Sequence, residues 1–237
     1  MDFTLDDNTH AQVLKLRHFI KNELQPLEDE VESKGVLDSK TAIKIFEKSR
    51  SLGFYGMNIP TEYGGGGFNA VQMVYLEQEM GQTTDPLIRR AFGNVYEVLL
   101  ACNESQQQQW LLPCVKGERT CSIAMTEPGV GSDSAGIKAT AKPDGDGWIL
   151  NAHKCPVGDG MFSDFYVVSA RSENVEGSRG ISLFLVDRSI SGVEVVRDMP
   201  MMGLRGSTHF EIKFKNVKLG PEHFSVNSLA SPLESFR

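Results

Sequence analysis

The chain has 237 residues and a formal net charge of −7, and 40% of its residues are hydrophobic while 23% are charged. These proportions are ordinary for a folded protein and exclude a collagen-like, coiled-coil or disordered chain. The length allows one large domain or two modest ones. Because the net charge is acidic and the basic residues are scattered, the composition argues against nucleic-acid binding as the main task.

The sequence shows no sign of membrane insertion or export. No apolar run approaches the roughly 18 to 20 residues that a membrane-spanning helix needs. Residues 1–7 are acidic and lack the basic and apolar regions of a signal peptide, which predicts a cytoplasmic protein. The cysteines form no C-x-x-C pair and have no histidine at metal-ligand spacing, so we expect free, mostly buried thiols and no metal site. They are Cys102, Cys114, Cys121 and Cys155.

The first half of the chain predicts helices, because its apolar residues recur at helical spacing between capping and breaking residues. Ser39 is expected to cap the second helix, and the apolar run before residue 101 predicts a helix buried on all sides. The run of glutamines at 106–109 is expected to form the polar face of a helix. The five expected helices cover residues 13–24, 39–53, 69–81, 87–101 and 105–113.

After Pro113 the pattern changes to short β-rich runs separated by Gly, Asp and Asn. Residues 144–147 are typical of a hairpin turn. Such runs indicate an antiparallel barrel or sandwich. The fold class predicted is α+β with two domains: a helical N-terminal domain over 1–114, an antiparallel β domain, assigned as a β-barrel, over 115–224, and a disordered tail over 225–237. The expected strands cover residues 121–125, 137–142, 148–152, 165–170, 181–186, 193–196 and 210–214.

Residues 125–136 form the most unusual loop of the chain, directly after the first expected strand. Its glycines let backbone N–H groups approach a planar or anionic ligand closely, and Thr126 and Ser132 carry hydroxyls that donate hydrogen bonds. The G-x-G within it is no dinucleotide-binding fingerprint, because no helix and no parallel βαβ unit follows.

This loop and several separated blocks, in this order, resemble the acyl-CoA dehydrogenase family over roughly residues 1–224. The blocks are I-P-T-E-Y-G-G at 59–65, L-P at 112–113 with G-E at 117–118, T-E-P-G-V-G-S-D at 126–133, G-W-I-L-N at 147–151 with Lys154, and M-G-L-R-G-S at 202–207. The resemblance implies a helical and a β domain that hold FAD, and a further helical domain. It also implies a carboxylate that removes the α-proton of an acyl-CoA while hydride leaves the β-carbon for the flavin.

The resemblance also implies site residues. The flavin would be contacted by Ile123, Met125, Thr126, Gly131 and Ser132, and Ser132 would also lie near the thioester of the substrate. The family usually has an aromatic residue and a hydroxyl residue two and four positions after the lysine, and this chain has Pro156 and Gly158 there. These two changes predict the loss of about 1 to 3 kcal/mol of flavin interaction.

The catalytic base of the family lies in the further helical domain, so none is assigned in this chain. Glu127 and Asp133 are expected to shape the loop through bonds to the backbone rather than to act as bases. We expect the chain to be inactive alone and to form a homo-oligomer or to pair with a complementing subunit that carries the C-terminal domain. Two alternatives stay open: a non-catalytic binding or assembly subunit on the same scaffold, and another flavin reaction of the superfamily, by a monooxygenase or an oxidase.

Overall fold

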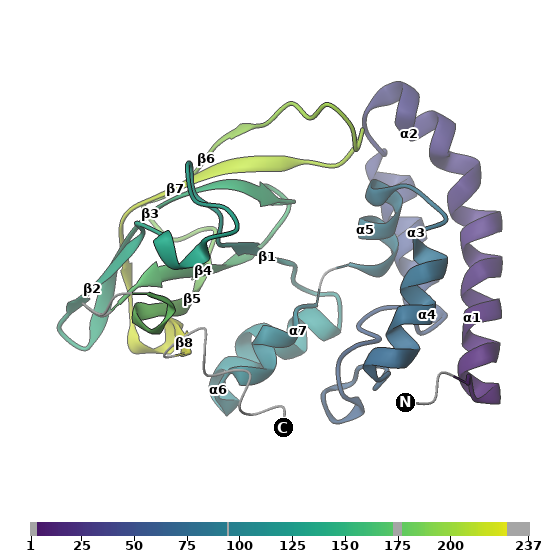
Figure 1. Ribbon diagram of the computed structural model, residues 1–237, viewed down its shortest axis with the longest axis horizontal. Coiled ribbons are helices and arrows are strands. Elements are labelled where there is room, and N and C mark those ends of the chain that lie inside the picture. The colour runs from purple at the N-terminus through teal and green to yellow at the C-terminus, as the bar shows by residue number, and fades with distance from the viewer. Residues whose placement is uncertain (1–3, 94, 173–176, 227–237) are drawn as a thin grey trace. The chain divides into compact units, whose positions relative to one another are not determined.

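The computed structural model describes residues 4–93, 95–172 and 177–226 and divides into two compact units (Figure 1). A helical unit comprises residues 1–95 together with 115–117 and 201–207, and a sheet unit comprises 96–114, 118–200 and 208–237. The tail expected from residue 225 lies, from residue 227 onward, outside the described residues. The domain boundaries expected after residues 114 and 224 stay predictions.

The helical unit consists of amphipathic helices whose ends follow local capping signals. Asn69 caps α4 with a full capping box together with Gln72, as its position in the sequence predicts. A π-helical turn and a 3-10 turn at Ile20–Leu24 and Gln25–Leu27 join α1 to α2. The helices are α1 (Asp7–Phe19), α2 (Glu28–Lys34), α3 (Ser39–Ser51), α4 (Ala70–Met80) and α5 (Asp85–Phe92).

Two helix predictions are wrong in detail. Asp38, not Ser39, caps α3, because its carboxylate accepts hydrogen bonds from the backbone N–H groups of Lys40 and Thr41. The long helix expected over 87–101 is split, since α5 ends before Gly93, whose φ is 62°. A positive φ combined with a ψ of −167° is readily adopted only by glycine, so the helix ends there at little cost. A separate 3-10 turn follows at Glu97–Ala101.

One face of each helix packs into a common core. Leu16 of α1 and Leu76 of α4 are fully buried, and the rings of Phe19, Phe54 and Phe92 contact one another at centroid distances of 6.0 to 6.3 Å. In Figure 1, α1 runs alongside α4, and α3 runs alongside α5. Burial of these apolar faces, rather than helix propensity, is what stabilises such short helices.

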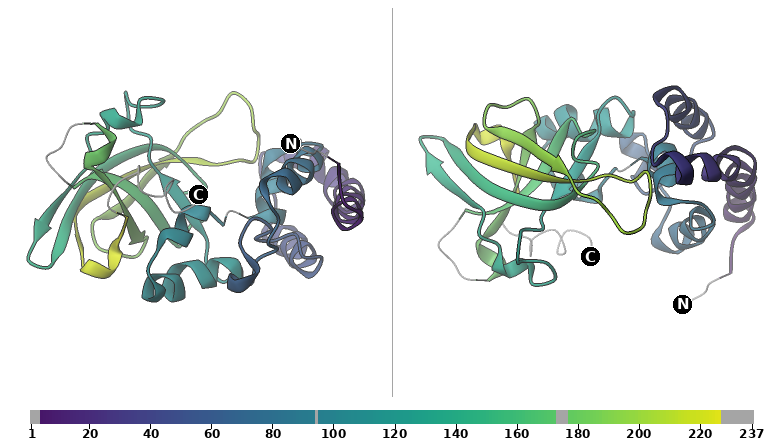
Figure 2. Two further views of the ribbon diagram at one scale, coloured as in Figure 1. Left: turned by 60° about the horizontal axis from the view of Figure 1, so that its bottom comes forward. Right: turned by 90° about the horizontal axis from the view of Figure 1, so that it is seen from above.

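The sheet unit contains one strongly curled sheet with the strand order β6-β7-β3-β2-β4-β5-β8, seen from two further directions in Figure 2. The predicted class, a helical region followed by a β-barrel domain, is confirmed. The pairing is mixed rather than wholly antiparallel, because β1 runs parallel to β4. The strands are β1 (Cys121–Ala124), β2 (Thr140–Asp144), β3 (Gly147–Gly158), β4 (Phe165–Arg171), β5 (Ile181–Asp187), β6 (Val193–Asp198), β7 (His209–Leu219) and β8 (Phe224–Val226).

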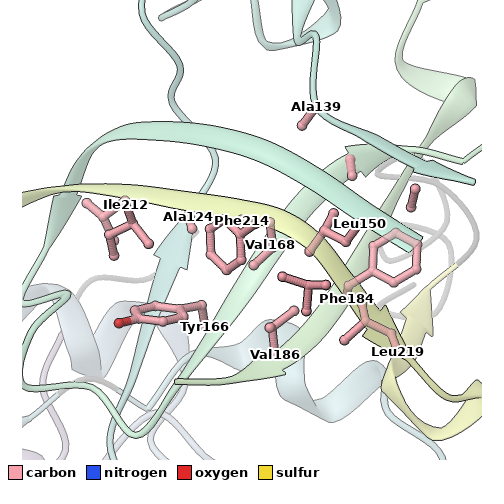
Figure 3. Close-up of a cluster of buried hydrophobic side chains, with 14 of the residues drawn as sticks. Ala124, Ala139, Leu150, Tyr166, Val168, Phe184, Val186, Ile212, Phe214 and Leu219 are labelled. Atoms are coloured by element: carbon pink, nitrogen blue, oxygen red, sulfur yellow. The ribbon is translucent and has the colours of Figure 1, made fainter. Parts of the chain in front are cut away.

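The concave side of this sheet encloses an apolar core (Figure 3). Tyr166 and Phe214 meet edge to face at 5.8 Å, and Leu150, Val168 and Phe184 pack beside them. Ala124 of β1 belongs to the same core. Because side chains alternate along a strand, the neighbours of Ala124 on either side point away from this core.

A helical segment completes the sheet unit. It consists of α6 (Glu104–Gln106), a π-helical turn at Gln107–Leu111 and α7 (Leu112–Val115). The last residue of α7, Val115, belongs to the helical unit. The helix therefore continues past Pro113, where it was expected to stop. In the glutamine run, Gln108 and Gln109 are exposed as expected, but Gln106 is buried and donates hydrogen bonds to the carbonyls of Glu222 and Phe224 at 2.7 Å.

The four cysteines all lie among the described residues and form no disulfide bond; three are buried and Cys155 is half-buried. Over the described ranges, no helix has the length and apolar character needed to cross a bilayer.

Candidate functional site

The loop after β1 begins with two side chains that lie outside the barrel core. Ile123 and Met125 flank Ala124, which is fully buried in the core, and both are half-buried. Both side chains therefore lie away from the barrel core, while the strand itself is held by its parallel pairing with β4 at Ile123 and Val167.

A tight turn follows at residues 127–130. Glu127 and Val130 exchange two backbone hydrogen bonds of 3.1 and 2.9 Å, and Gly129 between them has a φ of 83°. Proline followed by glycine at the two central positions is the signature of a type II turn, because the second position requires a positive φ. The sequence thus determines the shape of this part of the loop.

A buried ion pair holds the turn to the barrel. The ammonium of Lys154 on β3 is fully buried and donates to the Glu127 carboxylate at 2.8 Å, to the Met125 carbonyl at 2.9 Å and to the Ser169 hydroxyl at 3.1 Å. Glu127 also accepts hydrogen bonds from the backbone N–H groups of Lys138 and Ala139, at 2.7 and 3.0 Å. These bonds confirm the expectation that Glu127 shapes the loop.

The same contacts govern the ionisation of the pair. Burial works to raise the pKa of Glu127, but the hydrogen bonds from Lys154, Lys138 and Ala139 outweigh it and hold that pKa below its usual value. Burial lowers the pKa of the Lys154 ammonium, and the carboxylate of Glu127 offsets part of this effect. A carboxylate that is ionised and fully bonded in this way is a structural anchor rather than a general base.

The hydroxyls of the loop stand in a different environment. Thr126 is half-buried and Ser132 exposed, and neither side chain makes a hydrogen bond within the part of the chain that the structure describes. A side chain added at Gly131 would meet nothing within 4 Å. The outer part of the loop therefore presents two free hydroxyls and open space at a glycine. The Asp133 side chain, expected to bond the backbone, makes no such bond among the described residues.

The end of β3 lies against this loop. The backbone N–H of Cys155 donates to the Thr126 carbonyl at 2.9 Å, so Thr126 and the segment containing Pro156 and Gly158 are brought together. Pro156 is exposed and follows a cis peptide bond, and the carbonyl of Gly158 accepts a hydrogen bond from the Ser122 hydroxyl at 2.6 Å. Neither position offers an aromatic ring or a hydroxyl to a ligand.

A further acid, Asp159, is buried directly after β3. Its backbone N–H donates to the Thr208 carbonyl at 3.0 Å, and its carboxylate accepts from the Thr208 hydroxyl at 3.2 Å. Both bonds join Asp159 to Thr208, so Asp159 has a structural role at the end of β3.

Sequence reasoning missed the central role of Lys154, which it treated only as part of a family block. A signal was present, because Leu150, Ala152 and Lys154 alternate along one strand and the first of these is apolar and buried. A lysine on the core face of a strand requires a buried acceptor. Glu127 could not be identified as that acceptor from spacing, because 27 residues separate the two.

Comparison with known families matches both parts of the chain. The description "Acyl-CoA dehydrogenase, N-terminal domain" fits residues 7–118, and "Acyl-CoA dehydrogenase, middle domain" fits residues 122–217. Together these matches cover most of the chain. The protein therefore belongs to the acyl-CoA dehydrogenase family.

Particular relatives agree with this assignment. The chain is 31% identical to a 3-(aryl)acrylate reductase of Clostridium sporogenes, over 89% of this chain and 56% of that protein. It is 28% identical to a short-chain specific acyl-CoA dehydrogenase of Clostridium acetobutylicum, over 92% of this chain and 57% of that one. The chain thus spans just over half the length of these curated relatives.

Solved structures show the same architecture. A glutaryl-CoA dehydrogenase of Mycobacterium smegmatis in complex with FADH2 matches with a TM-score of 0.80 at 26% identity, over 97% of this chain and 58% of that one. Butyryl-CoA dehydrogenase of Megasphaera elsdenii matches with a TM-score of 0.82 at 25% identity, over 98% and 61%.

Proposed function

We propose that this chain supplies the N-terminal and middle domains of an FAD-dependent oxidoreductase that forms or removes the α,β double bond of an acyl-CoA thioester. The proposed domains are residues 1–114 and 115–224. Relatives named as dehydrogenases and as reductases both support an oxidoreductase of this class. The single observation that carries the proposal is the loop at 125–133, which is anchored from behind and presents unpaired hydroxyls on its outer side.

The residues present fit the edge of a flavin ring. The Thr126 hydroxyl, with no partner among the described residues, is available to a ring oxygen or nitrogen. Ile123 and Met125 offer apolar and polarisable surface beside it. Gly131 leaves room for close approach of a ligand to the backbone, and Ser132 is assigned to the region of the thioester.

FAD would supply the hydride chemistry, which no amino-acid side chain provides. In the proposed enzyme, this chain binds and orients the flavin. The turn at 127–130 and the Lys154 anchor hold the Thr126 hydroxyl in one position, which lowers the entropy lost when the ligand binds. Pro156 and Gly158 complete the flavin-facing surface as a small, rigid border without ring stacking.

The test is FAD binding by the purified chain, followed through the absorbance and fluorescence of the flavin, alone and with a complementing C-terminal helical domain from a relative. We expect saturable binding that Thr126→Val weakens about 2- to 13-fold, since one hydrogen bond contributes about 0.5 to 1.5 kcal/mol. Thr126→Ser keeps the hydroxyl and should bind nearly as the parent does. Absence of flavin binding in both preparations would refute the proposal.

A second candidate is a non-catalytic binding or assembly subunit, favoured by Pro156 and Gly158. It predicts that the parent chain binds no detectable flavin and that the double variant Pro156→Trp with Gly158→Thr does bind flavin. The proposed enzyme predicts measurable binding before these changes.

The proposal includes a partner, either a second copy or a subunit with the complementing domain. Its support is exposed apolar surface, such as Met161 and Phe162 of the sheet unit, which are 51% and 53% exposed. A homo-oligomer should appear in sedimentation velocity at high protein concentration, and a clean monomer would count against the second copy.

A further inference from the structure

The helical unit contains a cavity of about 370 Å³ that the proposed flavin chemistry does not use. Every residue that lines it belongs to that unit, including Val115 and Lys116, which join it from the far end of α7. The volume lies within the range of small-molecule sites.

The charged side chains that line this cavity are both cations. Among the described residues they are Arg50, in the last turn of α3, and Lys116. Among the described residues, neither the Arg50 guanidinium nor the Lys116 ammonium makes a hydrogen bond or an ion pair. Two cations that share a cavity without a counter-ion repel each other, and an anion bound between them removes this cost. Both residues are exposed, so their charges are accessible to an anion from solution.

Backbone hydrogen bonds hold the glycine segment that lines the cavity. The N–H groups of Gly64, Gly65 and Gly66 are all used in backbone hydrogen bonds, of 2.9, 3.2 and 3.0 Å. A Cβ on Gly66 would lie only 2.9 Å from the Met57 Cα, so this wall packs closely on the chain behind it and carries no side chains toward the cavity. The anion would therefore be held by side chains, and the glycine surface would contact the remainder of the ligand.

Two tyrosines and an aliphatic residue add a non-ionic surface. The Tyr63 phenol makes no hydrogen bond among the described residues and is available to an anionic oxygen. Tyr55 and Val115 are buried and form apolar lining. A lining that combines Arg, Lys and a phenol with apolar surface matches an organic phosphate, whose charge near pH 7 is about −1.5 to −2.

We propose that this cavity is a binding site for a small organic phosphate, held by Arg50 and Lys116 with a hydrogen bond from Tyr63. The guanidinium supplies a planar pair of donors and the ammonium a point charge, and together they balance a dianion. A monocarboxylate would leave one cation uncompensated. The site is independent of the loop at 125–133, which belongs to the sheet unit.

The test is isothermal titration calorimetry of the full chain at low ionic strength with adenosine monophosphate, inorganic pyrophosphate and adenosine. We expect both phosphates to bind and adenosine to bind at least tenfold more weakly. The double variant Arg50→Gln with Lys116→Gln should weaken phosphate binding by tenfold or more, and Tyr63→Phe by about 2- to 10-fold. Raised salt should weaken binding as well.

A matched control removes two exposed positive charges elsewhere, Lys40→Gln on α3 and Lys218→Gln on β7, and should leave binding unchanged. Thermal unfolding of each variant verifies folding. If phosphates do not bind, or if the control weakens binding as much as the double variant does, the site is refuted. Thr126→Val leaves this binding unchanged, so failure here and failure of the proposed flavin site are distinguishable.

Discussion

The Lys154 ammonium lies 2.8 Å from the Glu127 carboxylate, and both side chains are almost completely excluded from solvent. This pair joins β3 to the turn that follows β1. Because Lys154 also holds the Met125 carbonyl, a single buried cation determines where the proposed flavin loop begins.

Removal of one partner from this pair should destabilise the sheet unit strongly. Lys154→Met leaves the Glu127 carboxylate buried without its cation, for which we expect a loss of about 3 to 5 kcal/mol in the free energy of unfolding. Urea denaturation followed by tryptophan fluorescence measures it, because Trp110 and Trp148, the two tryptophans of the chain, both belong to the sheet unit.

The control is Lys215→Met, which breaks an exposed pair of 2.6 Å with Glu194. Exposed pairs contribute at most about 1 kcal/mol. Losses of equal size in the two variants would contradict the assigned role of Lys154.

The ionisation of Glu127 should make the free energy of unfolding depend on pH in the acidic range. Its pKa in the folded protein is held below the usual value, so folding favours the ionised form. The contribution is therefore complete above the ordinary carboxyl pKa of about 4.3 and is lost as the pH falls through the lowered pKa of the folded state. Glu127→Gln removes this contribution. Urea midpoints should fall less steeply between about pH 5 and pH 3 in the variant than in the parent, and identical slopes would be inconsistent with a lowered pKa.

The raised pKa of Tyr166 predicts a loss of stability at alkaline pH. Its hydroxyl donates to the Gly160 carbonyl at 2.6 Å within the core, and burial raises its pKa to about 12. Since the folded state holds the proton more tightly than the unfolded state does, this contribution is complete below about pH 10 and is lost as the pH rises toward 12. Absorbance at the tyrosinate band should include a phenol that titrates near pH 12 in the parent and is missing in Tyr166→Phe. The substitution should also cost about 1 to 3 kcal/mol.

The buried side chain of Gln106 should stabilise the fold, unlike the exposed side chain of Gln108. Gln106→Ala leaves the carbonyls of Glu222 and Phe224 without their side-chain donor, and we expect a loss of about 1 to 3 kcal/mol in urea denaturation. Gln108→Ala, at an exposed position two residues on, should change the stability by less than about 0.5 kcal/mol. Similar effects at the two positions would show that the carbonyl contacts contribute little.

Local patterns determined much of the fold. The helical and β-rich halves differ in periodicity, the Asn69 cap and the hairpin at 144–147 are short-range signals, and Pro128 with Gly129 specifies a type II turn. The errors also have local causes. Asp38 competes with Ser39 for the same N–H groups, and Gly93 ends a run that is apolar enough to continue as a helix.

The sequence by itself determined the fold class, the order of the elements, the family resemblance and the position of the glycine-rich loop, because each depends on residues close together in the chain. Only the tertiary structure decided that Lys154 anchors Glu127, that β1 runs parallel to β4, and that Arg50 and Lys116 share one cavity. Such relations join residues far apart in sequence. Their partners are selected by burial, since a charge on the inner face of a strand must find an acceptor wherever the fold provides one.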